Sequence, residues 1–526
     1  MLIETLIMTR TRGFLILTLF VLSAMQGAYA EHFCLRAKCK KEKRLAPELA
    51  LVRHAKSQYL GVCRDGKAVF DIPAGQVQTM QTMATNVDKE VPATEEQSKT
   101  LLISYTNAEN KPSAETLQAA GLNVVEDYEK GSFLVVQPVH AVSAQTVETL
   151  MADEAVTYAA PNYIMSIQPL DPPPEPLASV ASTVPNDPYL PQLWGMTNCG
   201  ATKVWPSYHE TPNVIVAVID TGVDYSHPDL KDNMWVSKSG KHGYDFYDND
   251  EDPMDEDNHG THCAGTIAGV GNNGVGVVGV SWKAQIMAMR FLGPDGSGST
   301  SDAVKCIDWA VANGAHILSN SWAGPDSSQE LYDAVSRAEK KGVLFVAAAG
   351  NTINTGNNND SHPYYPAALP QPNIISVGAI DSNNARGSFS HYGKQSVDIG
   401  APGVSIMSTT RDNSYSSFNG TSMATPHVAG AAAMVWGKTF ATPQQNASQM
   451  TTVRDLIYTN ARPVEALKTY WGQAAPAKIP GGVLDISFLQ QASPNNDSPG
   501  TPTQPRLRFA ENRMRVNPAR LRELTQ

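Results

Sequence analysis

The hydrophobic pattern of residues 186–490 repeats in a simple way, as short apolar stretches separated by segments with helical periodicity. Each apolar stretch is nearly continuous, which is typical of a strand whose two faces are both buried. Strands that alternate with helices in this way predict a three-layer α/β domain, a parallel sheet with helices on both faces. The predicted strands are 214–219, 286–289, 316–319, 343–348 and 374–377, and the predicted helices include 301–313 and 328–341.

A second and smaller pattern lies between residues 99 and 168. The predicted elements are strand 101–105, helix 113–120, strands 123–129 and 132–137, helix 143–152 and strand 155–163. This β-α-β-β-α-β order is the ferredoxin-like plan. We therefore expect a small, separate α+β domain in front of the larger one.

The ends of the chain and the segment between the two domains have compositions of their own. In the first 30 residues, Arg10 and Arg12 precede a short apolar run, and Ala28-Tyr29-Ala30 follows it, which is typical of a secretory signal peptide. A membrane anchor needs about 20 apolar residues, so we expect an exported protein with no stable membrane insertion after signal removal. The other predicted segments are a polar N-terminal extension (31–98), a Pro-rich linker (169–185) and a disordered basic tail (491–526).

Composition narrows the function classes. The chain has 526 residues, of which 42% are hydrophobic and 17% charged, and this balance excludes a mostly disordered or collagen-like protein. Its 40 Lys and Arg against 51 Asp and Glu give a net charge of −11, so nucleic acid is not an expected partner. Six cysteines are too few for a disulfide scaffold, and the sequence does not choose among their possible pairings.

Three motifs of the larger domain carry candidate chemistry. The first predicted strand runs into Asp220, which places a carboxylate at the carboxyl edge of the sheet, where α/β folds build their sites. The second motif, from Asn258 to His262, opens a segment of small residues that can hold an imidazole rigidly. In the third, Gly420-Thr421-Ser422, a serine enters an Ala-rich helix near its positive end.

Two kinds of chemistry fit these residues. A zinc site is one, with His259 and His262 as ligands beside Asp255 and Asp257, but the His-Glu-x-x-His spacing of zinc proteases is missing. Nucleophilic catalysis is favoured, because a serine hydroxyl is inert near pH 7 until a hydrogen-bonded imidazole accepts its proton. A buried carboxylate can then fix the tautomer of that imidazole.

With Asp, His and Ser motifs in this order, residues 186–490 resemble the subtilase family of serine proteases, thermitase-like and proteinase-K-like members in particular. The resemblance implies that Asp220 orients His259, that His259 takes the proton of Ser422, and that Ser422 attacks the peptide carbonyl. It also implies that the carboxamide of Asn351, after the strand 343–348, donates to the oxyanion.

The resemblance further assigns Ser321, Trp322, Ala323 and Gly324 to the strand that pairs with an extended substrate. The family more often has Leu-Gly-Gly after that serine, and Trp322 and Ala323 depart from this pattern. A large apolar side chain is the expected occupant of the specificity pocket.

Structural calcium is also implied, and no catalytic metal. Asp187, Asp229 and the loop 271–277 match one Ca²⁺ site of thermitase-like members, with Asn273 and the carbonyls of Val275 and Val277 as further oxygen ligands. A second site is matched by Asp245, Asp248, Asp250 and Asp252. A solvated acidic loop is the alternative for either set.

The ferredoxin-like segment 99–168 resembles the inhibitor pro-domain that precedes subtilase catalytic domains. Its end, near 162–167, would lie in the substrate cleft, and self-cleavage within 169–185 would release the mature, monomeric enzyme. The expected function is therefore a secreted serine endopeptidase, made as a self-processing zymogen, that acts on proteins or peptides. Two alternatives stay open, a peptide ligase or transpeptidase on the same site and a catalytically inactive binding protein of subtilase fold.

Overall fold

The computed structural model describes residues 51–53, 59–64, 67–73, 97–139, 150, 153, 155–168, 185–352, 357–472 and 478–490. The predicted signal peptide, most of the predicted linker and of the helix 143–152, and the predicted basic tail lie outside the described residues. Within the described part of the chain, no helix combines the length and the apolar content that crossing a membrane requires.

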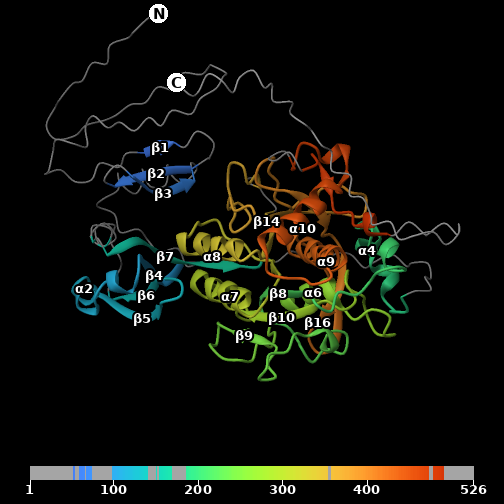
Figure 1. The fold of residues 1–526 in the computed structure, drawn as a ribbon, viewed down its shortest axis with the longest axis horizontal. Coiled ribbons are helices and arrows are strands. Elements are labelled where there is room, and N and C mark those ends of the chain that lie inside the picture. Colours follow the sequence, from blue (N-terminus) through green and yellow to red (C-terminus); the bar gives the residue numbers. More distant parts are fainter. Residues whose placement is uncertain are drawn as a thin grey trace, which may run out of the picture.

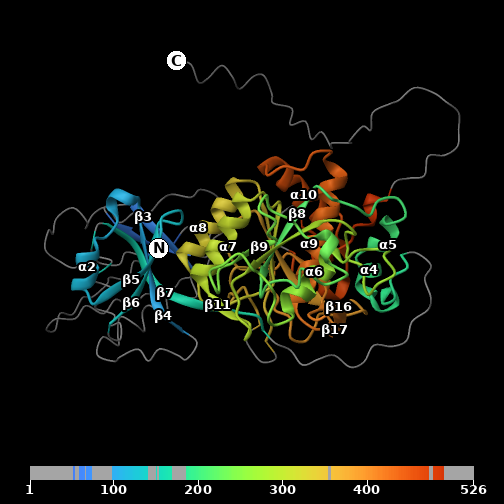
Figure 2. The ribbon, with the colours of Figure 1, turned by 90° about the horizontal axis from the view of Figure 1, so that it is seen from below.

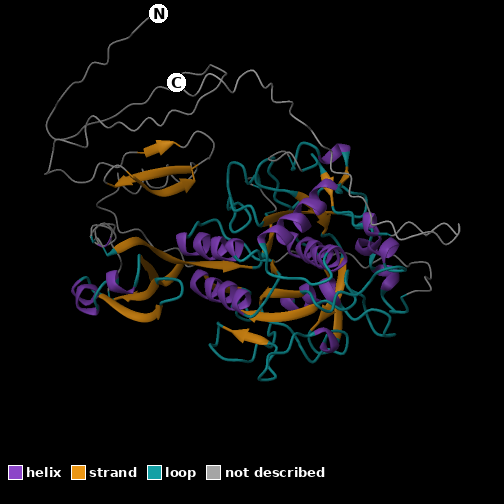
Figure 3. Ribbon diagram, viewed as in Figure 1, coloured by secondary structure: helices purple, strands orange, loops and turns teal. Residues whose placement is uncertain are grey.

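A sheet of mostly parallel strands forms the centre of the larger domain (Figures 1 and 3). The strands lie in the order β9 (Gly243–Asp245), β10 (Gln285–Arg290), β8 (Ile215–Asp220), β12 (Ile317–Asn320), β13 (Leu344–Ala348), β14 (Ile374–Ile380), β15 (Ile399–Pro402), β19 (Gly482–Val483) and β18 (Arg462–Pro463). Every neighbouring pair is parallel except β18 with β19. The predicted parallel sheet is confirmed, and the antiparallel edge adds to it.

Helices cover both faces of this sheet, as the continuous apolar strands predict. The side chains of Val216 and Val218 pack on one face and those of Ala217 and Ile219 on the other, so β8 is buried on both sides. The first face is covered by α6 (His259–Ala268), α9 (Thr421–Thr439) and α10 (Ala447–Thr459), and the second by α7 (Thr300–Ala312) and α8 (Gln329–Lys340).

The small domain has the ferredoxin-like strand order. Its sheet runs β7 (Val156–Ser166), β4 (Gln97–Tyr105), β6 (Phe133–Pro138), β5 (Leu122–Tyr128), with α2 (Ala114–Ala119) between β4 and β5. A strand of the larger domain, β11 (Ser297–Ser299), adds to the free edge of β7, so the two domains share one five-stranded sheet (Figure 2).

Shorter elements complete the structure. Three antiparallel strands precede the small domain, where the sequence pattern predicted no elements. They are β1 (Leu51–Arg53), β2 (Tyr59–Arg64) and β3 (Lys67–Pro73). The other elements are α4 (Trp194–Asn198), α5 (Ala201–Val204), the hairpin β16 (Ile406–Thr410) and β17 (Ser414–Phe418), and the 3-10 helices η2 (Ala108–Asn110), η3 (Leu190–Gln192), η4 (Lys231–Asn233), η5 (Glu465–Leu467) and η6 (Ser487–Leu489).

The strand order reverses beside β8. The chain places β10 on one side of β8 and then crosses to place β12 on the other. A crevice forms at the carboxyl ends of parallel strands where the order reverses, and this is where open α/β folds bind their ligands. Asp220, the last residue of β8, lies at this point.

Candidate active site

Asp220 and His259 form a buried hydrogen-bonded pair. Asp220 ends β8, and His259 is the first residue of α6. The Nδ1 and Oδ1 atoms lie 2.8 Å apart, and Oδ1 also accepts from the N–H of Thr221 at 2.8 Å. With the Nδ1 proton held by the carboxylate, the neutral ring keeps its lone pair on Nε2, which is the form that a general base needs.

Close packing between α6 and the end of β8 brings the pair together. A Cβ at position 260 would stand 2.0 Å from the carbonyl oxygen of Gly222, so only glycine lets the helix approach this closely. Buried Asp255 binds both motifs, accepting from Thr221 Oγ1 at 2.9 Å and from Thr261 Oγ1 at 2.6 Å. From the sequence, Asp255 was expected only as a possible neighbour of a zinc site. The signal that indicates this supporting role is a threonine directly after Asp220 and another two residues after His259.

Charge around His259 favours its protonated form. Burial alone lowers the pKa of His259, but the carboxylates of Asp220, Asp257 and Asp255 together outweigh it, and the pKa lies above its ordinary value. The imidazolium that forms when His259 accepts a proton is therefore stabilised where it is made.

Ser422 is the second residue of α9 and is buried. Its hydroxyl donates to the carbonyl oxygen of Ser321 at 2.9 Å, and Ser321 Oγ in turn donates to the carbonyl of Ser422 at 2.9 Å. The hydroxyl has to leave the Ser321 carbonyl before it can donate to His259, and contacts of this kind often tighten only when substrate binds.

Asn351 lies beside the start of α9 with its carboxamide fixed. Its Oδ1 accepts from the N–H and from the hydroxyl of Thr421, both at 2.9 Å. With the oxygen end held, Nδ2 is left to donate elsewhere. The N–H of Ser422 belongs to the first turn of α9, where backbone donors have no partner inside the helix. Together the two groups can bind a developing negative charge.

The strand predicted to bind substrate lies in the crevice. Ala323 exchanges backbone hydrogen bonds with Ser166 of the small domain, and Gly324 pairs with Tyr365. Trp322 lines the crevice together with Ser321 and Ala323, and its indole, 1% exposed, donates to the carbonyl of Ile219 at 3.0 Å.

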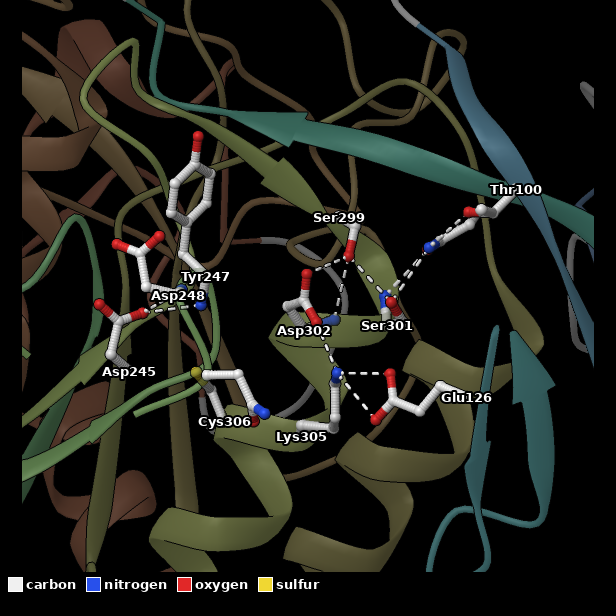
Figure 4. Close-up of polar contacts among 12 residues, drawn as sticks. Thr100, Glu126, Asp245, Tyr247, Asp248, Ser299, Ser301, Asp302, Lys305 and Cys306 are labelled. Atoms are coloured by element: carbon white, nitrogen blue, oxygen red, sulfur yellow. Dashed lines mark hydrogen bonds and ion pairs between the residues drawn. The ribbon is translucent and has the colours of Figure 1, made fainter. Parts of the chain in front are cut away.

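The small domain binds the larger one through α7 and α8. Lys305 of α7 lies between Asp302 and Glu126, at 2.7 and 2.9 Å (Figure 4). Asn162 accepts from the N–H of Ser301 at 3.0 Å, in the first turn of α7. The end of β7 then enters the crevice, as predicted for 162–167.

The first predicted calcium set comes together. Asp187 and Asp229 are both buried, and neither forms an ion pair in the part of the chain that the structure describes. Burial raises the pKa of both, that of Asp229 to about 6, and neighbouring Asp187 adds to the rise at Asp229. Asn273 Nδ2 donates to Asp229 at 2.8 Å. Two buried carboxylates beside an amide and a loop of carbonyls suit a divalent cation that prefers oxygen.

The second predicted set has a cation of its own. Buried Arg290 binds Asp245 at 2.8 Å and Asp248 at 3.1 Å, while exposed Asp250 follows Asp248 in the same loop. Because the guanidinium already neutralises two of the predicted ligands, this set does not fit calcium as the first one does. Arg290 follows an apolar run in β10, and no local motif pairs it with the acidic loop.

The zinc ligands weighed from the sequence do not converge. His262 Nε2 lies 2.9 Å from the carbonyl of Ile406, and burial lowers the pKa of His262 to about 3. Among the described residues, the group that could hold a metal is Asp220, His259 and Cys263, with ligand atoms within 4.8 Å. Burial raises the pKa of the Cys263 thiol well above its usual range, so it stays protonated and is a poor ligand.

Comparison with known proteins shows which sequences this chain resembles. A model of the subtilase family matches residues 211–491. The chain is 40% identical over 334 residues to a thermophilic serine proteinase from Bacillus sp. (strain AK1), covering 62% of this chain and 75% of that protein. It is 39% identical over 290 residues to thermitase from Thermoactinomyces vulgaris (55% and 95%), and 42% identical over 246 residues to subtilisin E from Bacillus subtilis (47% and 61%).

Proposed function

This chain belongs to the subtilase family of serine endopeptidases, and on that premise we propose that it is a secreted, self-processing zymogen with Asp220, His259 and Ser422 as its catalytic triad. The observation that carries the triad is the buried Asp220–His259 pair at the strand-order reversal, beside the helix that bears Ser422. Its substrates are proteins or peptides. Hydrolysis of an unstructured protein by the purified chain tests the activity.

The proposed reaction uses these groups in turn. His259 Nε2 accepts the proton of Ser422 as Oγ attacks the scissile carbonyl, and Asp220 stabilises the imidazolium that forms. Collapse of the tetrahedral intermediate expels the amine, which takes the proton from His259. Water then attacks the acyl-enzyme with His259 again as base, which returns Ser422 and releases the acid.

Asn351 is proposed to stabilise the oxyanion, and Asn351→Asp tests this. The aspartate keeps the oxygen that accepts from Thr421 but loses the Nδ2 donor, so the local fold is retained. We expect kcat to fall by about 10²–10³-fold with little change in KM, the loss typical of one missing oxyanion donor. Steady-state kinetics on a peptide substrate measure this. Asn413→Asp, at the exposed tip of the β16–β17 hairpin, is the matched control. An Asn351→Asp enzyme with unchanged kcat would remove the oxyanion role.

The small domain is proposed to act as the intramolecular inhibitor. Its sheet accepts β11, and Ser166 pairs with Ala323, so its last strand lies where an extended substrate would pair. Release requires a cut after this strand, and we place it between Gln168 and the end of the predicted linker 169–185. The predicted signal peptide supports export.

Calcium is proposed at the first acidic set alone, where it would supply the positive charge that two buried carboxylates need. The residues that would hold it are Asp187, Asp229, Asn273, Val275 and Val277. The paired Asp245 and Asp248 need no such ion, because Arg290 neutralises them.

Removing calcium should lower thermal stability. Ion at 100–1,000 times its Kd adds about 3–4 kcal/mol to folding, so a chelator should lower the Tm by roughly 10 °C for a domain of this size. The Ser422→Ala chain is the right sample, because it cannot digest itself during the melt. Asp229→Asn should abolish the calcium effect, whereas Asp412→Asn, an exposed control, should retain it. Identical melting curves with calcium and with chelator would contradict the site.

A further inference from the structure

Residues 166–168, at the end of the small domain, enter the crevice and approach Ser422. After β7, the N–H of Ile167 donates to the carbonyl of Gly296 at 3.0 Å, on the β11 side. On the other side, Ser166 and Ala323 exchange two backbone hydrogen bonds, at 3.1 and 3.3 Å. The segment is thus held along both edges, and it runs toward Ser422.

Gln168 is the next residue, and it lines the same small pocket as Ser422 and Asn351. Its side-chain carbonyl oxygen accepts a hydrogen bond from the backbone N–H of Asn351. Ala348 and Gly350 also line this pocket. The hydroxyls of Ser321, Thr421 and Ser422, which line it too, donate to other groups of the chain, whereas the N–H of Asn351 donates to Gln168.

We propose that this pocket binds the residue on the acyl side of the scissile bond and that it selects glutamine, an inference that rests on the proposed function. A side chain that fills the pocket covers the N–H of Asn351, and a buried donor without an acceptor is costly. Glutamine brings a neutral acceptor on an unbranched stem. Methionine has a similar length but no comparable acceptor, and glutamate brings a charge that none of the described lining residues neutralises.

This assignment differs from the large apolar residue expected from the sequence. The side chain of Trp322, which could have supplied an apolar wall, is turned into the core and bound to Ile219. The neighbours of Trp322 in the pocket wall, Ser321 and Ala323, have small side chains. The proposed preference for glutamine therefore depends on the backbone N–H of Asn351. A backbone donor is present at nearly every residue, so the sequence alone does not indicate this role.

The test uses peptides of the sequence Met-Ser-Ile-X joined to aminomethylcoumarin, with X as Gln, Met, Leu, Phe or Glu. In these peptides aminomethylcoumarin takes the place of Pro169, which follows Gln168 in the chain. Proline is replaced because its nitrogen is part of a ring, so that its amide differs from the amides of other residues. The wild-type chain is incubated until its pro-domain is released, and kcat/KM is measured for each peptide. We expect Gln to exceed Met and Leu by roughly 5- to 30-fold, the value of one satisfied hydrogen bond at a buried donor.

A second measurement separates binding from the chemistry of the leaving group. The product peptide acetyl-Met-Ser-Ile-Gln should inhibit with a Ki lower than that of acetyl-Met-Ser-Ile-Met by a similar factor. If Met, Leu or Phe is cleaved as well as Gln or better, the glutamine preference is wrong and the protease function stands. If no peptide is cleaved and no pro-domain is released, the proposed function fails and this inference falls with it.

Discussion

Replacing Ser422 with alanine should abolish peptide hydrolysis, with kcat lower by about 10⁶-fold, the loss that removal of the nucleophile causes in subtilisin. The expected cause is the loss of the only atom that forms the acyl-enzyme in the proposed reaction. The fold should survive, because the hydroxyl makes one hydrogen bond, to the carbonyl of Ser321. Progress curves at high enzyme concentration, beside a circular dichroism melt, measure both quantities.

The matched control for this variant is Ser414→Ala. Ser414 is exposed at the start of β17, the strand that leads to Ser422. The Ser414→Ala variant should retain wild-type activity. A loss of activity in this variant would show that replacing a serine in this region has an effect unrelated to the nucleophile. Activity of Ser422→Ala within tenfold of the wild type would mean that another group is the nucleophile.

Replacing Asp220 with asparagine should lower kcat by about 10⁴-fold, because an amide does not hold the imidazole in the required tautomer. A second effect has a definite sign. The Asp220 carboxylate raises the pKa of His259, so its loss should lower that pKa. Activity requires neutral His259, so the acid limb of the kcat/KM profile should move to lower pH in the variant. Rates measured across the pH range for both enzymes test the two effects together.

Asp232→Asn is the control for this change. Asp232 is exposed in η4, so its amide should leave both the rate and the pH profile unchanged. A tenfold loss in Asp220→Asn with an unshifted acid limb would contradict the role assigned to Asp220.

Much of the fold and the central site could be predicted from the sequence, because both depend on local signals. The apolar run before Asp220 fixes β8 as a strand buried on both faces, and Asp220 follows as its last residue. His259 and Ser422 open α6 and α9 within runs of small residues that let each helix pack closely. The family predicted from these motifs is the family that the comparisons give.

The features that could not be predicted depend on contacts between distant segments. Arg290 ends β10, and only the fold brings it to Asp245, so its ion pair with the acidic loop could not be predicted. The bond from the Trp322 indole to the carbonyl of Ile219 could not be predicted either, because it joins two strands that are far apart in the sequence. Gln168 lies at the edge of a Pro-rich linker, where no pattern indicates that it meets Asn351.

Intact mass spectrometry with a fluorophosphonate probe tests the central claim most directly. Ser422 should displace fluoride from the probe, and the wild-type chain should gain the mass of one phosphonyl group on Ser422 once its N-terminal region has been lost. The Ser422→Ala chain, treated alike, should keep its length and gain no mass. Labelling of the Ser422→Ala chain, or its maturation in pure form, would contradict the proposed triad and self-processing.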